Sequence, residues 1–336
     1  MRSEQTLQPD PAAEAEKSPN FLAHLNIQHA GLIGIIILLL VVASFSSPYF
    51  LSVSNFQNII RSMAVIGILA VGQTFVILTS GIDISVGAVL ALSAVVASVG
   101  SGNNFTLFCV LAISVGLLFG VLNGLAVVFG RIPAFITTLA TMTAARGLAE
   151  VISNSNPIYI NIPGYADISN ILILGIPLPG VFIIVIAAIA AFVLRYLPYG
   201  RSVYSVGSSE EVSRLSGLPV KSVLFSVYVI SGLLAGLAAV LYTSYTAVSQ
   251  ANAANGMEMN TITIVVLGGT SMLGGVGSIA GTVYGTIIIG LLQNLFNLLN
   301  MQTPMQQVMM GIVLIIALLL QNLHLNKFSL KKKSGR

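Results

Sequence analysis

The stretch Phe105–Gly130, FTLFCVLAISVGLLFGVLNGLAVVFG, contains no charged residue and no proline. At a helical rise of 1.5 Å per residue it is longer than the roughly 30 Å of hydrocarbon in a bilayer. An uninterrupted apolar run of this length is typical of a membrane-spanning helix rather than of a helix in a soluble core. The stretch therefore predicts that the chain is embedded in a membrane.

The composition of the whole chain points the same way. Of its 336 residues, 56% are hydrophobic and 7% are charged, whereas soluble domains carry roughly 25% charged residues. Such a composition excludes an ordinary soluble domain, and it excludes a disordered chain, which needs low hydrophobicity and high charge. The single cysteine, Cys109, lies within an apolar run, which excludes a disulfide framework and a cysteine-based metal site.

Ten apolar segments of this kind follow one another along the chain. They are Ala30–Phe45, Met63–Ser80, Ile84–Val99, Phe105–Gly130, Ala134–Ile152, Gly180–Leu197, Val223–Tyr245, Ile262–Leu273, Ile279–Leu299 and Met305–Asn322. Nine are long enough to cross a bilayer with a few interfacial residues at each end. Ile262–Leu273 is too short, so it borrows residues from the preceding loop, re-enters, or crosses as a broken helix sheltered by its neighbours. We expect an all-α polytopic membrane protein with about ten transmembrane helices.

The distribution of basic residues predicts the orientation, because Lys and Arg accumulate in cytoplasmic loops. With a cytoplasmic N-terminus and ten crossings, all of the 14 Lys and Arg residues except Arg61 and Arg146 face the cytoplasm. The predicted parts are a cytoplasmic tail (1–28), a transmembrane domain (29–323) with a cytoplasmic loop (198–221), and a basic cytoplasmic tail (324–336). The net charge of +4 then marks orientation and contact with anionic membrane lipids rather than binding to nucleic acid.

Motifs for chemistry are absent from the sequence. It contains no G-x-x-x-x-G-K-[ST] nucleotide loop, no H-E-x-x-H and no G-x-S-x-G. We therefore expect no catalytic residue, no metal site and no cofactor. Three charges lie in or beside the spans, and Asp83 is expected to cap the helix that follows it. Arg146 and Glu150, four residues apart, are expected to form an ion pair, and the alternative for all three is an ion or proton relay.

Several small and polar residues inside the apolar segments are candidates for a gate or a solute pathway. They are Asp83, Ser85, Gly87, Asn123, Thr137, Thr141, Gly268, Gly269, Asn294 and Asn297. Hydrogen bonding between helices is one interpretation of the polar members. A path for a polyhydroxylated solute would use the same chemistry, and the sequence does not separate the two.

The loop 198–221 contains the signals of a short helix. Ser208 or Ser209 can cap its start, Glu210 and Glu211 fall in its first turn, and Gly217 ends it. A short charged helix between two spans could be a docking element for a soluble partner or an ordinary linker.

Four motifs resemble those of permease subunits of ribose-type ABC importers. They are GIDISVG at 81–87, RIPAFI at 131–136, GRSVYSVG at 200–207 with RLSGLPVK at 214–221, and VVLGGTSMLGGVG at 265–277. The matches run from about residue 50 to residue 320 in the order that the family shows. The sequence departs from the family before the eighth span, where Asn260 replaces a usual acid, and this leaves the solute open.

The resemblance implies a bacterial inner-membrane permease that imports a monosaccharide or sugar-like solute. Its implied partners are cytoplasmic ATPase subunits, a second permease subunit, identical or related, and a periplasmic or lipid-anchored sugar-binding protein. Contact with the ATPase falls to Ser209, Glu210, Glu211, Arg214, Leu215 and Gly217. We assign the binding-protein face to the loops Ser153–Asn170 and Thr246–Thr261, which contain no Lys or Arg. An ion-coupled secondary transporter is the alternative.

Overall fold

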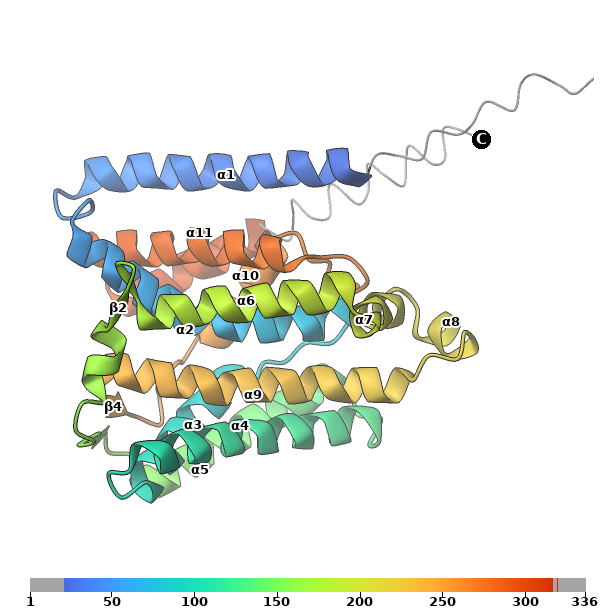
Figure 1. Ribbon diagram of the computed structural model, residues 1–336, viewed down its shortest axis with the longest axis horizontal. Helices are drawn as coiled ribbons and strands as arrows, with labels where there is room; N and C mark the ends of the chain where they lie inside the picture. The colour runs from blue at the N-terminus through green and yellow to red at the C-terminus, as the bar shows by residue number, and fades with distance from the viewer. Residues whose placement is uncertain (1–20, 317–318, 320–336) are drawn as a thin grey trace, which may run out of the picture.

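The computed structural model describes residues 21–316 and 319. The first 20 residues and the predicted C-terminal tail lie outside the described residues, as does the end of the last predicted span. Helix α1 (Phe21–Ser46) begins inside the predicted N-terminal tail. The described residues form a bundle of helices that run along a common direction (Figure 1).

Within the described part of the chain, five helices are long and apolar enough to cross a membrane. They are α2 (Val53–Leu78), α4 (Phe105–Val128), α6 (Leu178–Tyr196), α9 (Val220–Thr246) and α11 (Ile279–Leu298). Helix α1 and the more polar α5 (Ala134–Ser153) are also long, and a shorter apolar helix lies at Thr303–Ile316. A helix therefore occurs at each of these predicted segments, which confirms a mainly helical membrane fold.

Two of the helices at predicted spans, α3 (Val86–Gly100) and α10 (Met257–Leu267), are much shorter than a bilayer. Helix α3 has 15 residues and α10 has 11, which give lengths of about 22 and 16 Å. Helix α3 corresponds to the predicted segment Ile84–Val99 and begins two residues later, because residues 81–85 have no regular secondary structure. Helix α10 borrows residues from the preceding loop and ends where Gly269 adopts a positive φ of 88°.

Helices α2 and α9 form the centre of the bundle, and α4 packs closely along α9. The close approach of α4 and α9 depends on glycines. A methyl group at Gly116 or Gly120 of α4 would overlap the backbone of α9 near Gly232 and Gly236. Small residues that allow two backbones to touch are the usual basis of helix packing in membranes.

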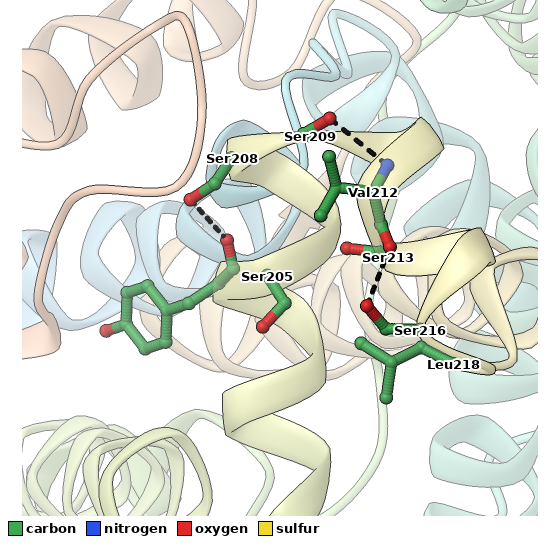
Figure 2. Close-up of a pocket in the computed structure, with 8 residues that line it drawn as sticks. Ser205, Ser208, Ser209, Val212, Ser213, Ser216 and Leu218 are labelled. Atoms are coloured by element: carbon green, nitrogen blue, oxygen red, sulfur yellow. Dashed lines mark hydrogen bonds between the residues drawn. The ribbon is translucent and has the colours of Figure 1, made fainter.

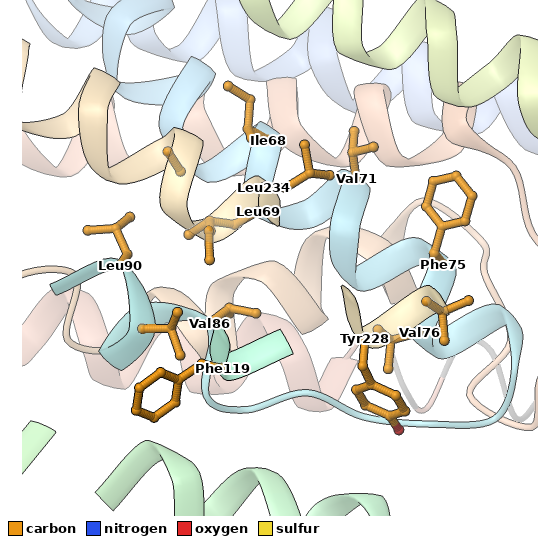
Figure 3. Packing of buried hydrophobic residues seen from close by; sticks show 14 of the residues in the cluster. Ile68, Leu69, Val71, Phe75, Val76, Val86, Leu90, Phe119, Tyr228 and Leu234 are labelled. Carbon is orange, nitrogen blue, oxygen red and sulfur yellow. The ribbon is translucent and has the colours of Figure 1, made fainter. Parts of the chain in front are cut away.

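The main hydrophobic core lies where α2, α3, α4 and α9 meet (Figure 3). Leu69 and Val76 of α2 lie there with Leu90 of α3, Phe119 of α4 and Leu234 of α9, all buried. This core packs against the non-helical segment 79–85 and holds the start of α3 inside the bundle.

The two ends of the bundle differ in structure. Helices α7 (Pro198–Ser208) and α8 (Glu210–Leu215) project from one end (Figure 1). The 3-10 helix η1 (Ala166–Asn170) and the strands β1 (Ile158–Tyr159), β2 (Leu172–Ile173), β3 (Ile176–Pro177) and β4 (Val248–Ser249) lie at the opposite end. Antiparallel pairs form between β1 and β4 and between β2 and β3. The sequence did not predict α7, which begins with a proline in its first turn.

Candidate functional site

A buried carboxylate, Asp83, lies at the centre of the bundle and is 2% exposed. Its Oδ1 accepts hydrogen bonds from the backbone N–H of Ser85 (3.0 Å) and from the Ser85 hydroxyl (2.6 Å). Its Oδ2 accepts a hydrogen bond from the hydroxyl of Ser231 on α9 (2.8 Å). Both carboxylate oxygens are therefore satisfied, as a buried charge requires.

The hydrogen bonds continue from Ser85 to two further helices. The amide of Asn123 on α4 donates to the Ser85 hydroxyl (2.9 Å). The hydroxyl of Thr141 on α5 donates to the side-chain oxygen of Asn123 (2.7 Å). The structure thus joins four of the predicted residues, Asp83, Ser85, Asn123 and Thr141, by hydrogen bonds. We call these four residues and Ser231 the Asp83 network.

Two more side chains hold the backbone beside Asp83. With its amide oriented to match, Gln73 of α2 donates to the carbonyl of Asp83 (3.0 Å) and accepts from its N–H (3.2 Å). Thr138 of α5 donates to the carbonyl of Ile82 (3.2 Å). Gln73, Thr138 and Ser231 were not among the predicted site residues. Their signal was a polar side chain within an apolar segment, which does not say what it contacts.

The capping role predicted for Asp83 needs correction. A capping side chain accepts from the N–H of the second or third helical residue, whereas Asp83 accepts from Ser85, which precedes α3. Ser85 itself makes no side-chain capping bond. Asp83 therefore fixes the chain that enters α3 and leaves the first turn of α3 to other partners.

A second buried carboxylate, Glu258, lies against that first turn. Glu258 is in the first turn of α10 and is 8% exposed. Its Oε1 accepts from the N–H of Gly256 (3.1 Å). A methyl group at Gly87 of α3 would overlap its Oε2 and the carbonyl of Ala254. Gly87 was predicted and Glu258 was not, because Glu258 stands in what the sequence presents as a loop.

Arg146 of α5 holds the chain that leads into α10. Its guanidinium donates to the carbonyls of Ala251 (2.6 Å) and Ala253 (2.7 Å). The predicted ion pair with Glu150 is therefore replaced by bonds to backbone carbonyls, and Glu150 acts on Arg146 only through its charge. The segment between β4 and α10 is drawn into the bundle, so only part of the predicted surface loop Thr246–Thr261 is at the surface.

The remaining gate candidates make no hydrogen bond with the Asp83 network among the described residues. The side-chain oxygen of Thr137 is buried and has no hydrogen-bond partner among the described residues. Gly268 packs against Gly281 of α11, where a methyl group would overlap the backbone. Asn294 exchanges two hydrogen bonds with Asn55 of α2 (2.8 and 3.1 Å). Asn297 accepts from Gln306 (3.0 Å).

The predicted short helix in the loop 198–221 is present as α8. The Ser209 side chain accepts from the N–H of Val212 (3.3 Å), as an N-cap does, and Gly217 has a φ of 79°. Glu210, Glu211 and Arg214 are exposed, and so is Leu215, at 79%. Val212 is also exposed, at 61%, so charged and apolar side chains share this surface.

A hollow of about 390 Å³ separates α7 from α8 (Figure 2). Five serines line it: Ser205, Ser208, Ser209, Ser213 and Ser216. Three of these hydroxyls are engaged in local hydrogen bonds to the backbone of α7 and α8. The residues that line the hollow are therefore mostly small and polar.

Helix α7 is tied to the loop 268–278 and to the end of α2. The Tyr204 hydroxyl donates to the carbonyl of Gly277 (3.0 Å), and burial raises the pKa of this hydroxyl. Gly275 donates to the carbonyl of Leu78 (2.9 Å), and Ser80 donates to the carbonyl of Leu273 (2.7 Å). A displacement of α7 and α8 would therefore reach the segment that carries Asp83.

The chain is similar to known transport proteins over most of its length. Residues 55–318 match the family described as "Branched-chain amino acid transport system / permease component". The chain belongs to this permease family. It is 38% identical to a ribose import permease of Haemophilus influenzae and 41% identical to that of Bacillus subtilis, with 85% and 84% of this chain and 91% and 89% of those proteins covered.

A relative with another sugar in its name is more distant. An L-arabinose ABC transporter permease of Azospirillum brasilense is 33% identical, with 90% of this chain and 89% of that protein covered. No solved structure matches the chain. The resemblance to permeases of ribose-type importers is confirmed, and the chain is a membrane permease subunit of a transport system.

Proposed function

We propose that this permease imports ribose or a close relative of ribose with energy from ATP hydrolysed by partner subunits. The observation that carries the proposal is the 38–41% identity to ribose import permeases over more than four fifths of the chain. The identity to the arabinose permease is lower, at 33%, which favours ribose over arabinose.

The cytoplasmic ATPase subunits dock on α8 and on the hollow between α7 and α8. The support is an exposed surface of mixed charge, with Leu215 standing out from it. Ser209, Glu210, Glu211, Arg214, Leu215 and Gly217 make the contact. This end of the bundle then faces the cytoplasm, with both termini and ten crossings as the charge distribution predicts, in a bacterial inner membrane.

The sugar-binding protein, periplasmic or anchored by a lipid, docks on the opposite end. Its support is the pairing of β1 with β4, which brings together the two loops that lack Lys and Arg. A second permease subunit, identical or related, completes the pathway for the solute. The Asp83 network holds the bundle in one arrangement until the ATPase moves α7 and α8.

Uptake into proteoliposomes tests this proposal. The permease is reconstituted with and without its ATPase and the sugar-binding protein, and uptake of radiolabelled D-ribose is measured. We expect uptake only with both partners and ATP. Uptake by the permease alone, driven by a sodium or proton gradient, would replace the proposal with the ion-coupled secondary transporter.

The docking assignment has a separate test. Replacement of Glu210, Glu211 and Arg214 with Ala removes the exposed charges of α8 and leaves its cap intact. We expect association with the ATPase, measured by co-purification, to fall about tenfold while membrane insertion is unchanged. Association equal to that of the wild type would exclude α8 as the docking element. Arg195→Ala, at the end of α6, is a matched control that should leave association unchanged.

A further inference from the structure

The two short helices begin at the same place inside the bundle. Gly87 is the second residue of α3 and Glu258 is the second residue of α10, and the two residues touch. The hydroxyl of Ser249 donates to the carbonyl of Ala94 (3.2 Å), so the chain before α10 runs back along α3 to its start. The N-termini of α3 and α10 therefore converge.

The residue that precedes each of these helices makes no capping bond with a side chain of its own. Ser85 before α3 and Gly256 before α10 make no side-chain capping bond, as is also true of the residues before α5, α6, α7 and α9. At α10, Oε1 of Glu258 accepts from the N–H of Gly256. The first turn of a helix leaves N–H groups without partners inside the helix and carries a partial positive charge. Broken helices that meet inside a membrane protein place such groups at solute-binding sites.

Glu258 provides an independent sign of a ligand at this junction. It is 92% buried, and its Oε2 has no hydrogen-bond partner among the described residues. That oxygen lies against the first turn of α3, at Gly87. A buried carboxylate oxygen without a donor is costly, so the arrangement favours any process that brings a donor to it.

We infer that the junction of α3 and α10 binds a hydroxyl group of the transported sugar, with Glu258 Oε2 as the acceptor. The inference rests on the proposed function. A hydroxyl both donates and accepts, so it can donate to Oε2 and accept from an N–H in the first turn of α3. Access to the junction requires α3 and α10 to separate, since Gly87 now packs directly against Glu258.

Other ligands fit the junction less well. An anion would be repelled by Glu258, while a cation would face the positive ends of two helices and the charge of Arg146, which acts on Glu258. A neutral group that both donates and accepts satisfies the junction without adding charge. This requirement selects a polyhydroxylated solute.

The test uses the complete complex of permease, ATPase and sugar-binding protein in proteoliposomes, with each binding protein saturated with sugar. Uptake per ATP hydrolysed is measured for D-ribose and for each monodeoxy analogue of ribose. In Glu258→Gln the side-chain oxygen can keep the bond to Gly256, so an NH₂ group, which donates, replaces Oε2. We expect wild-type uptake to fall about tenfold for the analogue that lacks the bound hydroxyl. In Glu258→Gln we expect slower ribose uptake and the loss of that preference.

Glu150→Gln is the matched control, because it removes the same charge near the same arginine from an exposed position. It should leave the ratio of ribose to analogue uptake unchanged. If Glu258→Gln lowers the uptake of ribose and of every analogue by the same factor, or leaves uptake unchanged, Glu258 is structural and the inference is overturned. If Glu258→Gln does not assemble, the ratio is measured in Glu258→Asp, and a wild-type ratio there overturns the inference as well. Absence of ATP-driven ribose uptake by the wild type would instead overturn the proposed function, and the inference with it.

Discussion

Two buried carboxylates lie on either side of the start of α3, and they differ in how they are satisfied. Asp83 accepts three hydrogen bonds, shared between its two oxygens. Glu258 accepts one, from its own helix start, and its second oxygen has no partner among the described residues. A fully bonded buried group favours a single arrangement, whereas a half-bonded one has capacity for another partner. The comparison therefore indicates that the Asp83 network fixes the structure, and we call it the lock, whereas Glu258 is available to bind a ligand.

The largest effect is expected from breaking the lock. Asp83→Ala leaves the Ser85 N–H, the Ser85 hydroxyl and the Ser231 hydroxyl without their acceptor in a buried site. We expect a loss of about 3 kcal/mol in stability, measured by thermal unfolding of the purified permease in detergent. Asp83→Asn keeps one acceptor oxygen and should lose about half as much. Equal stability of Asp83→Ala and the wild type would show that the network does not hold the bundle.

Removal of Arg146 should loosen the segment that leads into α10, the helix that carries Glu258. Arg146→Met keeps much of the side-chain length and leaves the carbonyls of Ala251 and Ala253 without their donor. We expect a loss of about 2 kcal/mol and faster proteolysis between β4 and α10. Arg61→Met is the control, because Arg61 donates to the carbonyl of Ser169 in η1 (2.9 Å) and should loosen η1 alone. Protection of the β4–α10 segment in Arg146→Met would contradict this role.

A side chain at Gly87 should force Glu258 away from α3, which tests whether the two residues are in contact. Gly87→Ala is expected to cost about 1–2 kcal/mol, because the methyl group would overlap Oε2 of Glu258 and the carbonyl of Ala254. The double variant with Glu258→Ala should lose less than the sum of the two single losses. Gly147→Ala in α5 is the control, since nothing lies within 4 Å of the added methyl group there. Additive losses would mean that Gly87 and Glu258 do not press on each other.

The sequence predicted the parts of this fold that depend on local patterns. Apolar runs located the helices, and the serine and glycine at 209 and 217 located α8. It also selected Asp83, Ser85, Asn123 and Thr141 as polar groups within apolar surroundings. It could not show that they form one network, because the partners come from distant parts of the chain, as with Ser231, 148 residues from Asp83.

The errors have physical causes as well. The non-helical residues before α3 include Ile82 and Ile84, so hydropathy does not distinguish them from a helix. Helix α10 starts among Met257, Glu258 and Asn260, whose polarity resembles that of a loop. The two arginines that do not fit the charge distribution, Arg61 and Arg146, each donate to backbone carbonyls of a segment between helices. Such a role leaves no trace in spacing or composition.

The smallest effect is expected at the far end of the Asp83 network. Thr141→Val keeps the shape of the side chain and removes the donor to Asn123. We expect a loss of about 1 kcal/mol or less, since hydrogen bonds between helices in membranes contribute about 0.6 kcal/mol on average, measured by the same thermal unfolding. Thr143→Val is the control, because Thr143 is exposed and its hydroxyl bonds only the carbonyl of Leu139 in its own helix (3.0 Å). A loss in Thr143→Val as large as in Thr141→Val would assign the effect to α5 itself and confine the lock to Asp83, Ser85 and Ser231.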